Sequence, residues 1–422
     1  MNRVGGRQMQ AAAVVVIVST RTNGAAEPAS RTAMQMRSSS APRRVLPSLV
    51  LAQFLGTSPW FAVNAVMPDL QRDFGWAAAS VGTLTSAVQV GFVVGALVFA
   101  LLAIADRYPP RGVFMLCALG SAACTVAAGA TASSFAVLVF WRALTGFLLA
   151  GIYPVGMKIA AQWFPRGLGA AMGLLIGALV LGSAAPHALR ALSTGWPWAF
   201  VFHGVAFASA LAGCLMVWLV PEVPVPVARA PGLYLGALTS LVTDAKVRAS
   251  VLGYFGHMWE LYTMWVLVPS VLATRISGAA LSWVAFGVLG SGAVGCAAGG
   301  WLALRLGSAR VAGIQLAISG LCCIAAPWML QARTPLFFGW LLLWGITVAG
   351  DSPQLSTLTA MNAPQESVGS VLTLTNSIGF GVSIASILLF VSLAETVPLA
   401  SLLPWLGLGP LLGLLALRPL LR

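Results

Sequence analysis

Charged side chains are scarce in this chain. Only 8% of its 422 residues are Asp, Glu, Lys or Arg, and only three are His, whereas about 25% of the residues of soluble proteins are charged. So few charges cannot cover a surface that faces water, which excludes a soluble globular protein. Hydrophobic residues make up 59% of the chain, a content that indicates an integral membrane protein.

The sequence also lacks the patterns that support catalysis, cofactor binding and metal binding. Its ten acidic residues form no pair at catalytic spacing, and there is no glycine-rich phosphate loop. Its six cysteines lie inside apolar stretches without the spacing of metal ligands. We therefore expect no enzyme activity, no cofactor and no bound metal.

Twelve apolar stretches are long enough to cross a hydrocarbon core about 30 Å thick as helices. They cover residues 46–67, 78–104, 112–132, 135–158, 168–189, 198–220, 249–272, 280–304, 311–330, 335–358, 367–392 and 397–417. The two-residue alternation that is typical of membrane-barrel strands is missing. The sequence therefore predicts an all-α integral membrane protein with twelve transmembrane helices.

The distribution of Lys and Arg outside these stretches predicts their orientation. With the amino terminus inside, the inner side collects Arg43, Arg44, Arg107, Arg111, Lys158, Arg166, Arg229, Lys246, Arg248, Arg305, Arg310, Arg418 and Arg422. The outer side has only Arg72, Arg190, Arg275 and Arg333. Because cytoplasmic loops are enriched in Lys and Arg, we expect both termini in the cytoplasm and the chain in the cell membrane. The net charge of +13 is then a topology signal and does not indicate nucleic-acid binding.

The chain repeats two patterns at nearly the same interval. AGIYP at 150–154 matches AGDSP at 349–353, an offset of 349 − 150 = 199. The pattern LxxF at 51–54 recurs at 252–255, an offset of 252 − 51 = 201. In membrane transport proteins such repeats form two halves with the binding site between them.

The repeat divides the chain into four segments. We expect two pseudo-symmetric six-helix bundles at 45–220 and 249–422, joined by a cytoplasmic linker at 221–248. Residues 1–44 hold seven Arg and one Glu, and we expect a disordered basic tail there. A cleaved targeting peptide is the alternative for this tail.

Six plus six spans, with both termini and a central linker in the cytoplasm, resemble the major facilitator superfamily of transporters. Residues 102–111 (LAIADRYPPR) are similar to the family signature G-x-L-A-D-R-x-G-R-R between spans two and three. Asp106, Arg107 and Arg111 are kept, and both glycines are replaced. A second family feature, an Arg followed four residues later by Gly in span four, occurs at Arg142.

The resemblance implies alternating access between the two halves and a small-molecule substrate, and we expect a monomer in the lipid bilayer. It also implies a gating latch at Asp106, Arg107 and Arg111, in which Asp106 pairs with a neighbouring Arg while the inner side is closed. The alternative is that Arg107 and Arg111 only fix the orientation of the spans.

Three ionisable residues lie deep within predicted spans, where charge is costly and marks function. Arg142, Glu260 and Asp351 lie in spans four, seven and ten, which the resemblance makes cavity-lining helices together with span one. His257 precedes Glu260 by one helical turn, so both side chains point to the same side. Alternatively, Arg142 ties span four to the carbonyl groups of a neighbouring helix, and Asp351 caps a broken helix or pairs with Lys158.

Several aromatic residues are expected in the same cavity, because they share a helix face with a buried charge or follow Pro59 in span one. They are Tyr153, Trp60, Trp340 and Trp344. The repeat places Pro59 opposite Glu260, since 260 − 201 = 59. A proline there breaks the helix and frees a carbonyl group, which suits a cavity wall.

The predicted mechanism is proton coupling. A carboxyl group at low dielectric constant binds a proton more readily than in water, so Glu260, with His257 beside it, is the expected proton carrier. Arg142 is expected to bind an anionic group or to expel the proton when substrate leaves. We predict a secondary active transporter driven by the proton gradient, with symport of a small organic or inorganic anion as the first interpretation. Proton-antiport efflux of drugs or metabolites is the alternative, and a non-transporting sensor is a distant one.

Overall fold

The computed structural model describes residues 42–164, 168–222, 236–364 and 367–421, and these residues form helices and connecting turns without any strand. The first half contains α2 (Val45–Thr57), η1 (Ser58–Phe61), α3 (Ala62–Phe74), α4 (Ser80–Leu101), α5 (Ile104–Arg107), α6 (Pro110–Ala130), α7 (Phe135–Leu149), α8 (Tyr153–Trp163), α9 (Leu168–Leu192) and α10 (Ala199–Leu219). The second half contains α11 (Ala237–Thr243), α12 (Ala245–Ala273), α13 (Gly278–Leu306), α14 (Ser308–Met329), α15 (Thr334–Gly350), α16 (Ser352–Asn362), α17 (Val368–Leu393), α18 (Leu399–Leu402), η2 (Leu403–Gly407) and α19 (Leu408–Leu421). Most of the tail predicted at 1–44, and residues 223–235 of the predicted linker, lie outside the described residues.

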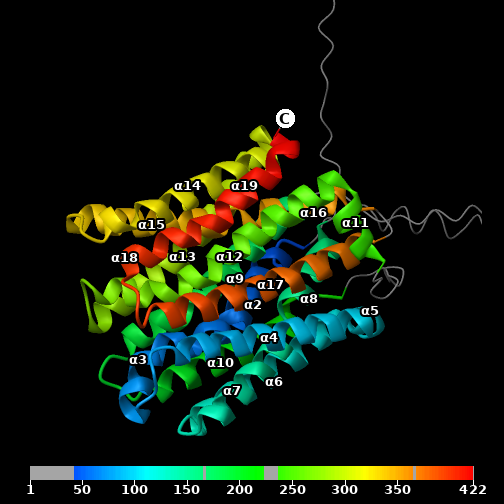
Figure 1. Ribbon diagram of the computed structural model, residues 1–422. Helices are drawn as coiled ribbons and strands as arrows, with labels where there is room; N and C mark the ends of the chain where they lie inside the picture. Colours follow the sequence, from blue (N-terminus) through cyan, green and yellow to red (C-terminus); the bar gives the residue numbers. More distant parts are fainter. Residues whose placement is uncertain (1–41, 165–167, 223–235, 365–366, 422) are drawn as a thin grey trace, which may run out of the picture.

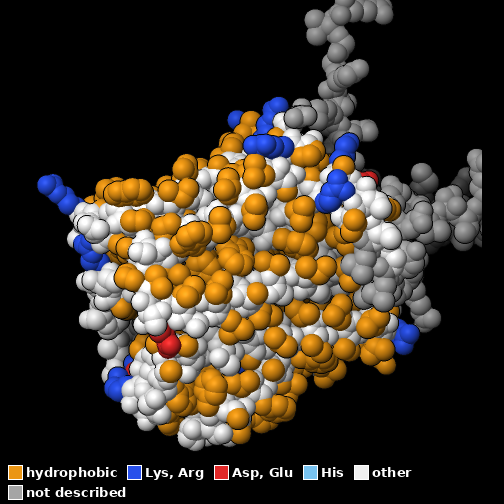
Figure 2. All heavy atoms as spheres, viewed as in Figure 1, with side chains coloured by type: hydrophobic (Ala, Val, Ile, Leu, Met, Phe, Trp, Pro, Cys, Tyr) orange, Lys and Arg blue, Asp and Glu red, His pale blue; other side chains and the backbone are white. Residues whose placement is uncertain are grey.

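Eleven helical segments in the described part of the chain are long and apolar enough to cross a membrane. α12, with 29 residues, is the twelfth long segment, and its buried residues include His257 and Glu260. Hydrophobic side chains cover most of the visible face, and Lys and Arg lie toward its margins (Figure 2). The prediction of an all-α membrane protein with a twelve-helix layout is confirmed.

The two halves meet along two pairs of helices. α9 packs against α13, and α4 packs against α17 (Figure 1). Within the first half, α6 packs against α7 and α10, and α2 packs against α9 and α10. Within the second half, α12 packs against α17 and α19, and α14 packs against α15 and α19. Each half is therefore a helical bundle, and the two bundles meet mainly along α9–α13 and α4–α17.

A close helix crossing occurs at equivalent places in both halves. Gly146 of α7 lies so near α4 that a Cβ atom would overlap the carbonyl oxygen of Val88. Gly345 of α15 makes the same approach to Val288 of α13. The offset, 345 − 146 = 199, equals that of the AGxxP pattern. Glycine allows such backbone contact because it has no side chain, so the sequence repeat is also a structural repeat.

The AGxxP pattern forms a helix break in each half. α7 and α8 are separated at residues 150–152, and α15 and α16 are separated at Asp351. Pro154 and Pro353 lie in the first turn of the second helix, where a missing N–H group leaves no hydrogen bond unmade. The spans predicted as single helices at 135–158 and 335–358 are therefore two helices each, because proline begins a helix but interrupts its interior.

Candidate functional site

A small cavity lies between the two halves, with about 30 Å³ of space open to a water-sized molecule. α8 and α9 line it from the first half, and α12, α15, α16 and α17 line it from the second. The lining residues are Tyr153, Ile176, Leu179, Val180, Tyr254, Met258, Leu261, Tyr262, Trp265, Ala349, Ser352, Ser356, Asn376 and Phe380. A solute in this space would contact both bundles at once, as alternating access requires.

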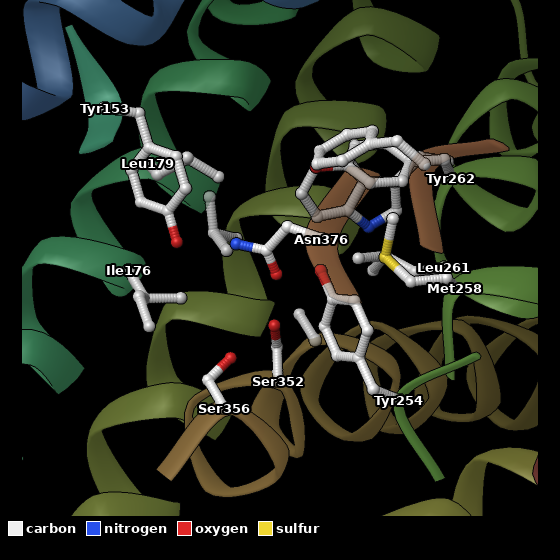
Figure 3. A pocket seen from close by; sticks show the side chains of 14 residues that line it. Tyr153, Ile176, Leu179, Tyr254, Met258, Leu261, Tyr262, Ser352, Ser356 and Asn376 are labelled. Carbon is white, nitrogen blue, oxygen red and sulfur yellow. The ribbon is translucent and has the colours of Figure 1, made fainter. Parts of the chain in front are cut away.

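Six of the lining side chains carry a hydroxyl or amide group, and five of them face one another. Tyr153, Tyr254, Ser352, Ser356 and Asn376 extend toward a common space (Figure 3). Tyr153 is the first residue of α8 and Ser352 is the first residue of α16, at an offset of 352 − 153 = 199. The repeated helix break therefore brings one hydroxyl group to the cavity from each half.

An aromatic cluster backs one wall of the cavity. The ring of Trp60 stacks on those of Tyr262 and Phe380, with centroid distances of 6.2 and 5.7 Å. Phe61 stacks on Tyr262 at 6.1 Å and meets Trp265 edge-on at 5.5 Å. Trp60 is fully buried and lies behind the lining residues that it contacts, so its contribution to the cavity is indirect.

Arg142 does not line the cavity. Its guanidinium is buried and donates hydrogen bonds to the carbonyl oxygen of Pro59, at 2.8 Å, and to that of Trp60. The Ser58 hydroxyl donates to the carbonyl oxygen of Leu55 at 2.7 Å, a carbonyl group that the proline nitrogen four residues later cannot serve. These are the contacts expected for the alternative interpretation of Arg142, a tie between span four and the carbonyl groups of a neighbouring helix.

Glu260 lies inside the second half, with 1% of its surface exposed. It accepts hydrogen bonds from the Ser319 hydroxyl at 2.9 Å and the Trp344 indole at 2.6 Å, and from the Cys323 thiol at 3.1 Å. These partners come from α14 and α15, so Glu260 and Trp344 face the bundle interior. Trp340 also faces inward and donates to a backbone carbonyl of α14 at 3.0 Å.

His257 pairs with Asp351 rather than with Glu260. The Nδ1 atom lies 2.8 Å from Oδ1 of Asp351, and both side chains are 1% exposed. The two groups are close enough for an ion pair, although they are not aligned as a hydrogen bond. The His257 ring lies 5.7 Å from that of Tyr254, and Asp351 immediately precedes Ser352. The pair is therefore directly behind the cavity wall.

The residues of the predicted latch lie at the end of the molecule that carries α5 and α11 (Figure 1). Asp106 pairs with Lys158 of α8 at 2.5 Å, and both side chains are 25% exposed. Arg111 pairs with Glu222 at 2.7 Å and donates to carbonyl oxygens at the end of α10. Arg107 is exposed. Asp106 thus meets a Lys instead of the expected Arg, and Lys158 is not available to Asp351.

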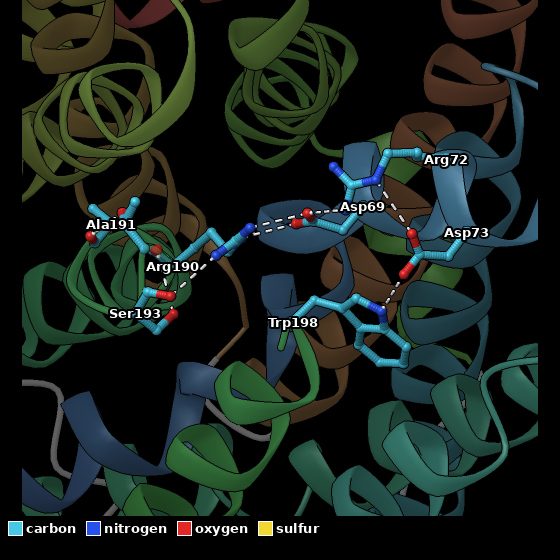
Figure 4. A network of polar contacts seen from close by, with 8 residues as sticks. Asp69, Arg72, Asp73, Arg190, Ala191, Ser193 and Trp198 are labelled. Atoms are coloured by element: carbon cyan, nitrogen blue, oxygen red, sulfur yellow. Dashed lines mark hydrogen bonds and ion pairs between the residues drawn. The ribbon is translucent and has the colours of Figure 1, made fainter. Parts of the chain in front are cut away.

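A second charge network occupies the opposite end of the first half (Figure 4). Asp69 of α3 accepts two hydrogen bonds from Arg190 of α9, at 2.8 and 2.9 Å. Arg72 bridges Asp69 and Asp73, and Asp73 accepts a hydrogen bond from the Trp198 indole at 2.9 Å. This network ties α3 to α9 and to the start of α10.

Sequence reasoning found Tyr153 but missed most of the polar cavity lining. Tyr254, Ser356 and Asn376 carry no charge, so nothing in the sequence separates them from ordinary helix-packing residues. A signal was present on α12, where Tyr254, Met258, Leu261 and Trp265 follow one another at helical intervals on a single face.

Comparison with known proteins gives a family match over most of the chain. The family described as the Major Facilitator Superfamily matches residues 49–387. A chloramphenicol resistance protein from Streptomyces lividans is 30% identical over 269 residues, which cover 63% of this chain and 67% of that protein. A gallate transporter from Pseudomonas putida is 31% identical over 171 residues, 39% of this chain and 38% of that transporter.

The fold is shared with solved structures at lower identity. The crystal structure of the human organic anion transporter MFSD10 superposes with a TM-score of 0.69 at 17% identity. The match covers 89% of this chain and 99% of that one. At this identity the likeness shows a common fold.

Proposed function

Because the chain belongs to the major facilitator superfamily, we propose that it is a proton-coupled secondary transporter that carries a small organic solute by alternating access. One observation supports the proton coupling most directly. Three buried ionisable residues, His257, Glu260 and Asp351, gather on α12 and at the start of α16, behind the wall of the cavity between the halves. Ionisable groups at membrane depth are costly and are kept where they serve transport.

Glu260 is the proposed proton carrier. Its three hydrogen-bond donors are neutral, and no Lys or Arg pairs with it in the described part of the chain. A carboxylate without a cationic partner is costly to bury, whereas a protonated carboxyl group is not. Binding and release of a proton therefore change the energy of the second half, and this change can bias the two states of the transporter.

The His257–Asp351 pair offers a route between the cavity and Glu260. His257 lies one helical turn before Glu260 on α12 and pairs with Asp351. His257 and Asp351 lie directly behind Tyr254 and Ser352, which line the cavity. We propose that a proton passes through this pair to Glu260, because imidazole and carboxyl groups both bind and release protons.

Symport remains the first proposal for the direction of coupling, and proton-driven efflux is the second. The relative named as a gallate transporter agrees with transport of an organic solute, and the relative named as a chloramphenicol resistance protein favours the efflux alternative. An inorganic anion is disfavoured because Arg142, the buried cation expected to bind it, is held by backbone carbonyl groups.

We further propose that the protein is a monomer of the cell membrane with both termini in the cytoplasm. This orientation puts α5, α11 and the Asp106–Lys158 pair on the cytoplasmic side. It rests on the excess of Lys and Arg in the loops at that end.

Proton movement in liposomes tests the proposed function. The purified protein is reconstituted with a pH-sensitive dye in the lumen, and chloramphenicol, gallate or nitrate is added outside. Symport acidifies the lumen as solute enters, and antiport makes it more alkaline. Protein-free liposomes correct for passive entry. Uptake of solute without any pH change would contradict proton coupling, and uptake of nitrate alone would contradict an organic substrate.

A further inference from the structure

The lining of the cavity between the halves is uncharged. None of its fourteen described residues is Lys, Arg, His, Asp or Glu. Its apolar part includes the rings of Tyr262, Trp265 and Phe380, which stand together as one aromatic wall. A charged solute would leave water for a site without an opposite charge, which is strongly unfavourable. An aromatic solute would bury its ring against this wall.

The polar groups of the lining have no protein partners. Within the described residues, the hydroxyl groups of Tyr153, Tyr254, Ser352 and Ser356 and the amide of Asn376 form no hydrogen bond with the protein. The lining also includes Trp265, whose indole nitrogen is buried without a partner. Tyr153, Ser352, Ser356 and Asn376 are only partly buried, so water can serve these groups in the absence of solute. A solute that displaces this water has to supply hydrogen-bond partners in its place.

The arrangement of these groups constrains the ligand further. Tyr153 and Ser352 reach the cavity from opposite halves, at the two repeated helix breaks. In Figure 3 the amide of Asn376 lies between the hydroxyl groups of Tyr153 and Tyr254. Hydroxyl and amide groups both donate and accept hydrogen bonds, so they suit hydroxyl, ester or amide substituents rather than a single ion.

We infer that the substrate is an uncharged aromatic solute that carries several hydroxyl, ester or amide groups. Its ring packs against Tyr262, Trp265 and Phe380, and its polar groups bond with Tyr153, Tyr254 and Asn376. This inference rests on the proposed function and names the substrate class of the same cavity. It replaces the anion expected from the sequence, because the lining provides no cation to receive one.

Binding of matched probes to the purified protein tests this inference. Methyl gallate and gallate share a ring and three hydroxyl groups, but only gallate is an anion at neutral pH. Inositol is uncharged and hydroxylated but not aromatic. By titration calorimetry in detergent, we expect methyl gallate to bind roughly ten-fold or more tightly than gallate, and inositol not to bind. Tighter binding of gallate or inositol, or no binding of methyl gallate at millimolar concentration, would overturn the inference.

Two variants locate the bound probe. Tyr254→Phe and Asn376→Leu each remove polar groups, and we expect about five-fold weaker binding of methyl gallate for each lost hydrogen bond. Tyr108→Phe is the matched control, because Tyr108 is 62% exposed and lies outside the cavity. Melting temperatures verify that each variant is folded. Wild-type affinity in folded Tyr254→Phe and Asn376→Leu would contradict the assigned site.

The substrate class and the proton coupling are contradicted by different experimental results. Calorimetry needs no proton gradient, so methyl gallate binding without solute-driven proton movement would support the substrate class and contradict the proposed coupling. Proton movement driven by gallate, with no binding of methyl gallate, would support coupling and contradict the substrate class.

Discussion

Replacement of Arg142 separates a structural role from a substrate-binding role. Arg142→Met keeps an unbranched side chain but removes the guanidinium that serves the carbonyl groups of Pro59 and Trp60. Both groups belong to η1, which also carries the aromatic residues behind the cavity wall. The variant should therefore weaken the break in span one without removing a contact to substrate.

The magnitude follows from the two carbonyl groups that lose their donor. Each buried polar group left unsatisfied costs about 1–3 kcal/mol, so the two together cost about 2–6 kcal/mol. The buried guanidinium, with 1% of its surface exposed, is itself costly to desolvate, and its removal offsets part of this loss. We expect a net destabilisation near the lower limit, about 2–3 kcal/mol.

Thermal unfolding in detergent, together with calorimetric titration of gallate, measures both roles. Arg275→Met is the matched control: Arg275 also donates to two backbone carbonyl groups, but it is exposed, so water can replace it. We expect a clear fall in melting temperature for Arg142→Met and a change below about 0.5 kcal/mol for Arg275→Met. An unchanged melting temperature combined with loss of gallate binding would show that Arg142 anchors an anion, and would refute the structural assignment.

Two further predictions concern helix packing and gating. Gly146→Ala places a methyl group against the carbonyl oxygen of Val88 and should cost about 1–3 kcal/mol or more in thermal stability. Gly287→Ala is the control and should leave stability unchanged, because the added methyl group meets nothing within 4 Å. Equal melting temperatures for the two variants would contradict the close crossing. Asp106→Asn removes the partly exposed ion pair with Lys158 and should lower stability by at most about 1 kcal/mol. It should nevertheless change the transport rate, because the pair links α5 to α8 at one end of the first half. A wild-type transport rate in liposomes would argue against a latch.

The fold could be predicted because its signals are spread along the chain. Apolar length gives the helices, and the repeat gives the two halves. The AGxxP pattern identified equivalent positions in the two halves. It did not show that the helix is interrupted there, because this follows from Pro154 and Pro353 lying in the first turn of new helices. An apolar stretch has the same composition whether its helix is continuous or interrupted. The sequence therefore predicted one helix where the structure has two, at α7–α8 and at α15–α16.

The site was predicted less completely, for a geometric reason. Successive residues of a helix point about 100° apart, so Leu261 lines the cavity while Glu260 faces the bundle interior. The sequence marks Glu260 as unusual but does not show which face of α12 meets the other half. The pairing of His257 with Asp351 depends on how two helices distant in the chain are packed, and no local spacing encodes it.

Uphill transport by Glu260→Gln tests proton coupling most directly. Glutamine keeps one oxygen, which can accept from Trp344 and Cys323, and its NH2 group can donate to the Ser319 hydroxyl, but it cannot bind or release a proton. Glu395→Gln is the control, since Glu395 only accepts a hydrogen bond from a backbone N–H at one end of the molecule. In liposomes with a pH gradient, we predict that Glu260→Gln loses accumulation of radiolabelled solute but keeps exchange at equal concentrations on both sides, while Glu395→Gln keeps both. Accumulation by Glu260→Gln at the wild-type level would contradict the role of Glu260 as the proton carrier.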